Sequence, residues 1–186
     1  MGVEMLTYVS LLRGVNVGRQ KRIKSEELIT LYESLGFQNV KTYVQSGNII
    51  FNSAENIKEL PNIIEKEIKQ VFSFPVVVLL RTSAQLQQII NSNPFLAEQS
   101  LNTDKLHITF LSNTPNYLAL SQITEIQDEL DRFVANNKEI YLYCPNGYGK
   151  TKYTNGFFEK KLGVTATTRN WKTVITLFEI AKNLSV

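Results

Sequence analysis

Short apolar runs alternate with helical patterns along the first 82 residues of this 186-residue chain. Leucines and isoleucines at helical spacing predict two helices, one beginning at Ser25 and one at Pro61, where a proline is tolerated in the first turn. Apolar runs bounded by turn residues predict strands over residues 6–12, 40–44, 49–51 and 76–81. The order β-α-β-β-α-β is that of a ferredoxin-like unit.

The second half of the chain repeats part of this rhythm. Strands are predicted over 106–111 and 139–143, and helices over 117–134, over 154–162 and from Asn170 onward. We therefore expect an α/β (α+β) protein made of two ferredoxin-like units. The expected boundaries are residues 1–82 for the N-terminal unit, 83–104 for a connecting helix and linker, and 105–186 for the C-terminal unit with its terminal helix.

Single copies of cysteine and histidine exclude several classes of site. Cys144 alone cannot form an internal disulfide or a multi-cysteine metal site, and His107 alone cannot form a two-histidine zinc motif. We expect no metal and no cofactor. His107 is interpreted as a residue on a sheet face and Cys144 as a packing residue, with a reactive thiol left open by the nearby Lys150 and Lys152.

Neither a secretory leader nor a membrane-spanning run is visible in the sequence. The longest apolar stretch, residues 75–80, is far shorter than the roughly 18 residues that span a bilayer. A cytoplasmic protein without membrane contact is expected, either a monomer or a weak homodimer.

The net charge of +3 conceals two strongly basic segments. Residues 13–24 carry five cations and no carboxylate, and residues 145–172 carry six cations and one carboxylate, so each segment is +5 and the rest of the chain is −7. Clustered cations raise the local concentration of anions. Both segments also contain glycines in loops, where backbone N–H groups can approach a phosphate or carboxylate.

Two nucleotide-binding motifs are only partly matched. Gly149-Lys150-Thr151 ends like a phosphate-binding loop, but Cys144 stands where that motif needs a glycine. The loop after the first strand has Gly14 and Gly18 without the third glycine of a Rossmann fingerprint. A ferredoxin-like unit with an arginine after its first strand also resembles acylphosphatase, in which case Arg13 would hold a phosphate and Asn48 would orient a water.

Five stretches of the sequence together resemble the bacterial family called domain of unknown function 1697, DUF1697. They are residues 8–18 (YVSLLRGVNVG), 35–37 (LGF), 42–48 (TYVQSGN), 93–95 (NPF) and 167–174 (TTRNWKTV). The resemblance covers nearly the whole chain and implies a compact cytoplasmic bacterial protein built from ferredoxin-like units, without implying an activity. The sequence departs from the family pattern at Arg19 and Gln20, which replace a glycine and an asparagine and make the first loop more basic.

We expect an anionic ligand, either a phosphate-bearing metabolite, a nucleotide or a nucleic acid, in a basic cleft that both basic segments face. An acylphosphatase-like phosphate-transfer enzyme and a protein–protein interaction module are the alternatives, so the sequence leaves catalysis open. A structural role also remains open for the asparagines, since Asn170 is suited to cap a helix. The predicted ligand-binding residues are Arg13, Gly14, Asn16, Gln45, Ser46, Asn48, Gly147, Lys150, Arg169 and Asn170.

Overall fold

The computed structural model describes residues 4–17, 21–44, 47–125 and 130–184. The chain divides into two compact units, one formed by Met1–Gln87 together with Thr176–Val186 and the other by Gln88–Ile175. It passes from one unit to the other within α3 (Ser83–Asn91) and returns within α6 (Trp171–Leu184). Each unit is described below by itself.

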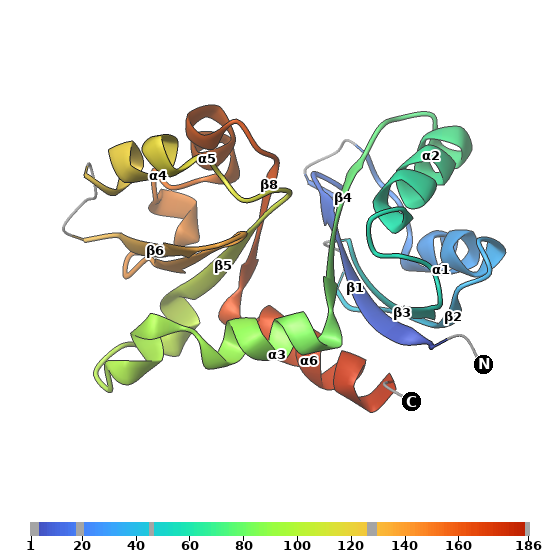
Figure 1. Ribbon diagram of the computed structural model, residues 1–186, viewed down its shortest axis with the longest axis horizontal. Coiled ribbons are helices and arrows are strands. Elements are labelled where there is room, and N and C mark those ends of the chain that lie inside the picture. Colours follow the sequence, from blue (N-terminus) through green and yellow to red (C-terminus); the bar gives the residue numbers. More distant parts are fainter. Residues whose placement is uncertain (1–3, 18–20, 45–46, 126–129, 185–186) are drawn as a thin grey trace. The chain divides into compact units, whose positions relative to one another are not determined.

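The N-terminal unit contains a four-stranded antiparallel sheet in the order β2-β3-β1-β4. Two helices cover one face of this sheet (Figure 1). The elements follow one another as β-α-β-β-α-β, which confirms the predicted ferredoxin-like unit. They are β1 (Leu6–Arg13), α1 (Ser25–Ser34), β2 (Gln38–Thr42), β3 (Asn48–Ser53), α2 (Leu60–Phe72) and β4 (Val77–Thr82).

An aromatic cluster fills the space between this sheet and its helices. Phe51 of β3 stacks on Phe37 with ring centroids 4.6 Å apart and meets Tyr32 of α1 edge-on at 5.3 Å. The Tyr32 hydroxyl is buried and shares a hydrogen bond of 2.7 Å with Ser10 Oγ of β1. Because side chains alternate between the faces of a strand, Tyr8 and Leu12 pack into this core, whereas Arg13 lies on the face away from α1 and α2.

The C-terminal unit repeats the same arrangement with the order β6-β7-β5-β8. Its helices α4 and α5 also cover one face of the sheet (Figure 1). The elements are β5 (Leu106–Leu111), α4 (Tyr117–Thr124), β6 (Arg132–Asn136), β7 (Glu139–Tyr143), α5 (Asn155–Leu162) and β8 (Ala166–Asn170), with short 3₁₀ helices η1 (Pro94–Ala97), η2 (Thr103–Lys105) and η3 (Tyr148–Lys150).

The helix predicted over residues 117–134 was wrong in its second half. The helix α4 ends at Thr124, and residues 132–136 form the edge strand β6 instead. Asn137 adopts a φ of 54°, which turns the chain tightly from β6 into β7. Strand β8 was also missed, because its threonines and Arg169 do not form an apolar run.

Strand register shows that the two units are copies of one pattern. Val9 of β1 pairs with Arg81 of β4, and Ile108 of β5 pairs with Arg169 of β8. Each arginine donates Nη1–H to the carbonyl of the residue before it, at 2.8 Å for Arg81 and 3.0 Å for Arg169. The expected pair of ferredoxin-like units is therefore present, and Arg81 and Arg169 occupy equivalent positions in them.

Within the described ranges, every helix is too short or too polar to cross a lipid bilayer.

Candidate functional site

The basic loop that follows β1 is closed by its own asparagine. Asn16 accepts a hydrogen bond from the Ile23 backbone N–H at 2.9 Å and donates its Nδ2–H to the Ile23 carbonyl at 3.0 Å. The Asn16 backbone N–H reaches the Lys21 carbonyl at 3.0 Å. These bonds join Asn16 to Lys21 and Ile23, so the predicted residue Asn16 has a structural role among the described residues of this segment.

A second loop, which leads into β3, packs directly against this one. The Leu12 N–H donates to the Gly47 carbonyl at 2.8 Å. Gly47 has a φ of +73°, and a Cβ at this position would lie 2.4 Å from Val15 Cγ2. Only glycine fits such an approach. The predicted residues Gln45 and Ser46 of this loop lie outside the described residues.

Asn48 is placed at the first position of β3 and is buried, with 1% of its surface exposed. Its Nδ2–H donates to the Tyr43 carbonyl at 3.0 Å and thereby closes the turn between β2 and β3. An asparagine that orients an attacking water must present its amide to the solvent. The acylphosphatase comparison required that of Asn48, and the buried amide does not provide it.

Two residues of the first basic segment lie beside the start of β4, Arg13 through its backbone and Lys21 through its side chain. Arg13, half-buried at the end of β1, pairs with Val77 of β4. Lys21 donates its Nζ–H to the Pro75 carbonyl at 3.0 Å, and its ammonium lies 6.0 Å from the centroid of the Phe74 ring. Arg22 follows and is exposed. We call Arg13, Lys21 and Arg22 the β4-start cluster.

The predicted residue Gly14 lies next to this cluster, directly after Arg13. Its φ of +76° is a left-handed conformation that glycine adopts readily, and the space around its Cα is open. Gly14 therefore lets the chain leave β1 sharply while keeping the loop backbone accessible.

The second basic segment contains the loop from β7 to α5. Its predicted residue Gly147 has a φ of +92°, and Lys150 in η3 is exposed. Tyr148 of the same loop stacks on His107 of β5, with ring centroids 5.0 Å apart. The Cys144 N–H donates to the Lys105 carbonyl at 3.0 Å, so the loop lies where β5 begins and β7 ends.

Arg169 and Asn170 both make structural contacts at the end of β8. Arg169 is 8% exposed and donates Nη1–H to Thr167 Oγ1 at 2.8 Å as well as to the Thr168 carbonyl. Asn170 accepts a hydrogen bond from the Thr173 N–H at 2.7 Å, which caps the first turn of α6. Of the other predicted residues in this unit, Lys150 is exposed and the space around the Gly147 Cα is open, and their binding of a ligand stays a prediction.

Each basic segment is located within its own unit, and the two positions differ: one is where the first strand of the unit ends, and the other is where the first strand begins. The β4-start cluster lies where the first strand of its unit ends and the fourth begins. The loop with Lys150 follows the third strand of its unit, at the end where β5 begins. Under the internal repeat the two loops are therefore not equivalent, and their sharing of one cleft stays a prediction.

His107 and Cys144 are poorly suited to catalysis. Burial, together with the charge of Lys105, lowers the pKa of His107, while a hydrogen bond between Nδ1 and the Lys105 carbonyl acts in the opposite direction. Burial raises the pKa of Cys144 to about 11, so the thiol stays protonated at neutral pH and the possibility of a reactive thiol loses its support.

Sequence reasoning missed Arg81 and the role of Lys21. Arg81 of β4 is 6% exposed. A single arginine at the end of an apolar run was the sequence feature that could have identified it. Lys21 carried no signal beyond its charge, because its partner Pro75 is 54 residues away in the chain. No group of three or more metal-ligating side chains gathers in the part of the chain that the structure describes.

Comparisons with known proteins identify the family and the fold of the chain and do not assign an activity. No curated protein matches its sequence. Its fold is similar to "the structure of conserved bacterial protein SP0830 from Streptococcus pneumoniae", with a TM-score of 0.77 and 21% identity over 95% of this chain and 99% of that one. The model of the family "Protein of unknown function (DUF1697)" matches residues 5–141. The chain belongs to the DUF1697 family.

Proposed function

We propose that the N-terminal unit binds the anionic group of a ligand at the β4-start cluster. The observation that carries the proposal is the bond from Lys21 Nζ to the Pro75 carbonyl, which places the ammonium just before β4, the strand with which the Arg13 backbone pairs. An ammonium has three donors, and Lys21 gives one to the Pro75 carbonyl. That bond fixes the position of the ammonium while leaving donors for an anion.

The closed loop strengthens this proposal. Holding charged side chains in place before binding reduces the entropy that a ligand must overcome. Asn16 contributes to this order through its two bonds to Ile23, and Gly47 contributes through the hydrogen bond that its carbonyl accepts from the Leu12 N–H. A loop that only exposes lysines to solvent would need neither the hydrogen bonds of Asn16 nor the glycine at position 47.

Titration of the wild-type protein with inorganic pyrophosphate, followed by thermal unfolding, tests the proposal. A ligand at 100 times its dissociation constant stabilises the native state by about 2.7 kcal/mol. The stabilisation should disappear in Arg13→Ala and Lys21→Ala and persist in Lys41→Ala, which removes an exposed cation from β2 of the same unit. An equal stabilisation of all four proteins would refute the proposal.

Lys150 and Gly147 form a second candidate subsite, supported by the exposed position of Lys150 and the open space around the Gly147 Cα. The same titration with Lys150→Ala tests it. A loss of stabilisation in this variant would assign the C-terminal loop to anion binding, and an unchanged response would remove that loop from the site.

A further inference from the structure

We infer that residues 93–98 of the C-terminal unit form a strap that opens locally while the sheet of that unit stays folded, and that Arg132 of β6 holds the strap closed. The inference is independent of the proposed anion site. It rests on the side-chain contacts that join the strap to the sheet and on one buried donor that the closed strap leaves unsatisfied.

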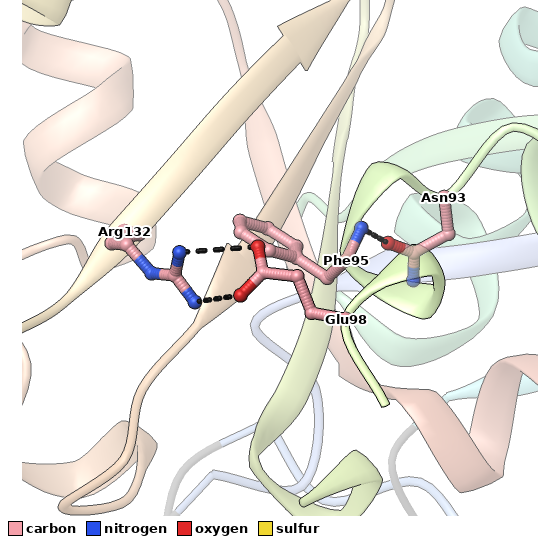
Figure 2. Close-up of polar contacts among 4 residues, drawn as sticks. All are labelled: Asn93, Phe95, Glu98 and Arg132. Carbon is pink, nitrogen blue, oxygen red and sulfur yellow. Dashed lines mark hydrogen bonds and ion pairs between the residues drawn. The ribbon is translucent and has the colours of Figure 1, made fainter. Parts of the chain in front are cut away.

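The backbone of the strap forms its hydrogen bonds locally. The Leu96 N–H donates to the Asn93 carbonyl at 3.3 Å, and the Glu98 N–H donates to the Phe95 carbonyl at 3.1 Å. The Asn93 side chain accepts from the Phe95 N–H at 3.1 Å, as Figure 2 shows. Because these bonds stay within the strap, side chains must hold it on the sheet.

An ion pair with Glu98 is the polar part of this connection. Arg132 donates Nη1–H to Glu98 Oε1 at 3.2 Å and Nη2–H to Glu98 Oε2 at 3.0 Å (Figure 2). Both side chains remain partly in solvent, with 37% of Arg132 and 43% of Glu98 exposed. A bidentate pair of this kind fixes geometry, but water and salt weaken an exposed pair, so it can break without disturbing the core.

Two aromatic rings are the apolar part of the connection. Arg132 and Tyr143 are cross-strand partners on β6 and β7, so their side chains share one face of the sheet. The guanidinium carbon of Arg132 lies 5.3 Å from the ring centroid of Tyr143 and 5.3 Å from that of Phe95. Arg132 therefore contacts the sheet and the strap at once, through a planar group that stacks on rings better than an ammonium does.

Asn93 opposes the closed position of the strap. It is 6% exposed, and its Nδ2 has no acceptor among the described residues. A buried donor without an acceptor destabilises the state that buries it, and opening would expose this donor to water. The burial of Phe95 and the contacts of Arg132 act in the other direction. We therefore expect the strap to open more readily than the sheet unfolds.

Hydrogen exchange of the full-length protein, followed by NMR, tests the inference. The amides of Phe95, Leu96 and Glu98 report on the strap, and those of β5 and β7 report on unfolding of the unit. In the wild type, the strap amides should have protection factors at least tenfold lower than the sheet amides. High salt should lower the protection of the strap further and leave the sheet unchanged.

Three variants identify the group that holds the strap. Arg132→Lys keeps the charge but loses the bidentate pair and the planar stacking, so it should lower the protection of the strap at least threefold without affecting the sheet. Glu98→Gln should lower it as well and remove its salt dependence. Lys160→Ala, which removes an exposed cation from α5 of the same unit, should leave strap and sheet as they are in the wild type.

Two results would overturn the inference. Equal protection of strap and sheet amides in the wild type would show that the strap opens only when the unit unfolds. A locally opening strap whose protection is the same in the wild type, Arg132→Lys and Glu98→Gln would show that Arg132 does not hold it closed.

Discussion

Asn16 and Ile23 are joined by two hydrogen bonds between one side-chain amide and one backbone residue. Oδ1 of Asn16 accepts from the Ile23 N–H, and Nδ2 donates to the Ile23 carbonyl, at 2.9 and 3.0 Å. Asn16 also has a φ of 55°, a left-handed conformation that asparagine tolerates better than most residues. This pair ties the chain after β1 to the chain just before α1.

Replacing Asn16 with glycine should therefore destabilise the protein by about 1–3 kcal/mol, since each hydrogen bond contributes about 0.5–1.5 kcal/mol. Glycine keeps the left-handed backbone, so the loss reports on the side chain. Urea unfolding measures it. Asn16→Asp keeps the acceptor for the Ile23 N–H and should lose less. Equal stability of the glycine variant and the wild type would show that the two hydrogen bonds between Asn16 and Ile23 do not stabilise the protein.

Gly47 and Gly36 offer a matched pair of left-handed glycines. At Gly47 a Cβ would lie 2.4 Å from Val15 Cγ2 and 2.8 Å from Leu12 Cβ, whereas at Gly36 nothing lies within 4 Å. Gly36→Ala should cost about 1–2 kcal/mol for the backbone conformation alone. Gly47→Ala should cost about 1–3 kcal/mol more, because the packed loops must separate. Thermal and urea unfolding of both variants check the difference, and similar losses would contradict the close approach.

The N-terminal unit could be predicted from the sequence because its strands are apolar runs between clear turn signals. The missed strands β6 and β8 lack this signal. Edge strand β6 follows a helical pattern without a glycine or proline to mark the change, and β8 places two threonines before Arg169. Both strands are edges of their sheet, and β8 buries threonine and arginine side chains that hydrogen bonds satisfy, so its burial leaves no apolar run in the sequence.

The candidate site was predicted only in part for a related reason. Sequence patterns identify residue types, so Arg13, Asn16 and Asn48 could be selected as polar residues in loops. Residue type alone does not tell whether such a side chain binds a ligand or its own backbone: Asn48 donates to the Tyr43 carbonyl and closes its own turn. The contact of Lys21 with Pro75 joins residues 54 positions apart, which local composition does not encode.

Asn170 provides a test that separates structure from ligand binding. Its side chain accepts from the Thr173 N–H at 2.7 Å at the start of α6. Asn170→Ala should cost about 0.5–2 kcal/mol through the lost cap, and Asn170→Ser should restore most of the stability because serine also caps helices. Urea unfolding gives both values. If serine fails to restore stability, the cap is not what Asn170 contributes.

Cys144 should resist alkylation in the native protein. Burial raises the pKa of its thiol to about 11 from an ordinary value near 9, and its side chain is fully buried. At pH 8 the thiolate fraction is then about 100-fold lower than that of an unperturbed cysteine. Iodoacetamide labelling followed by mass spectrometry should be at least 100-fold slower in the native protein than in urea. Rapid native labelling would show that the thiol is accessible.

The same thiol predicts how stability changes at alkaline pH. Because the folded pKa of Cys144 lies above the unfolded one, its contribution to the free energy of unfolding is complete below about pH 9 and is lost as the pH rises toward 11. Burial also raises the pKa of Tyr141 to about 12, which adds to the decline at higher pH. Urea unfolding from pH 8 to pH 11 should show a shallower decline in Cys144→Ala than in the wild type, since alanine has no proton to lose. Parallel curves would mean that the thiol ionises alike in the folded and unfolded chains.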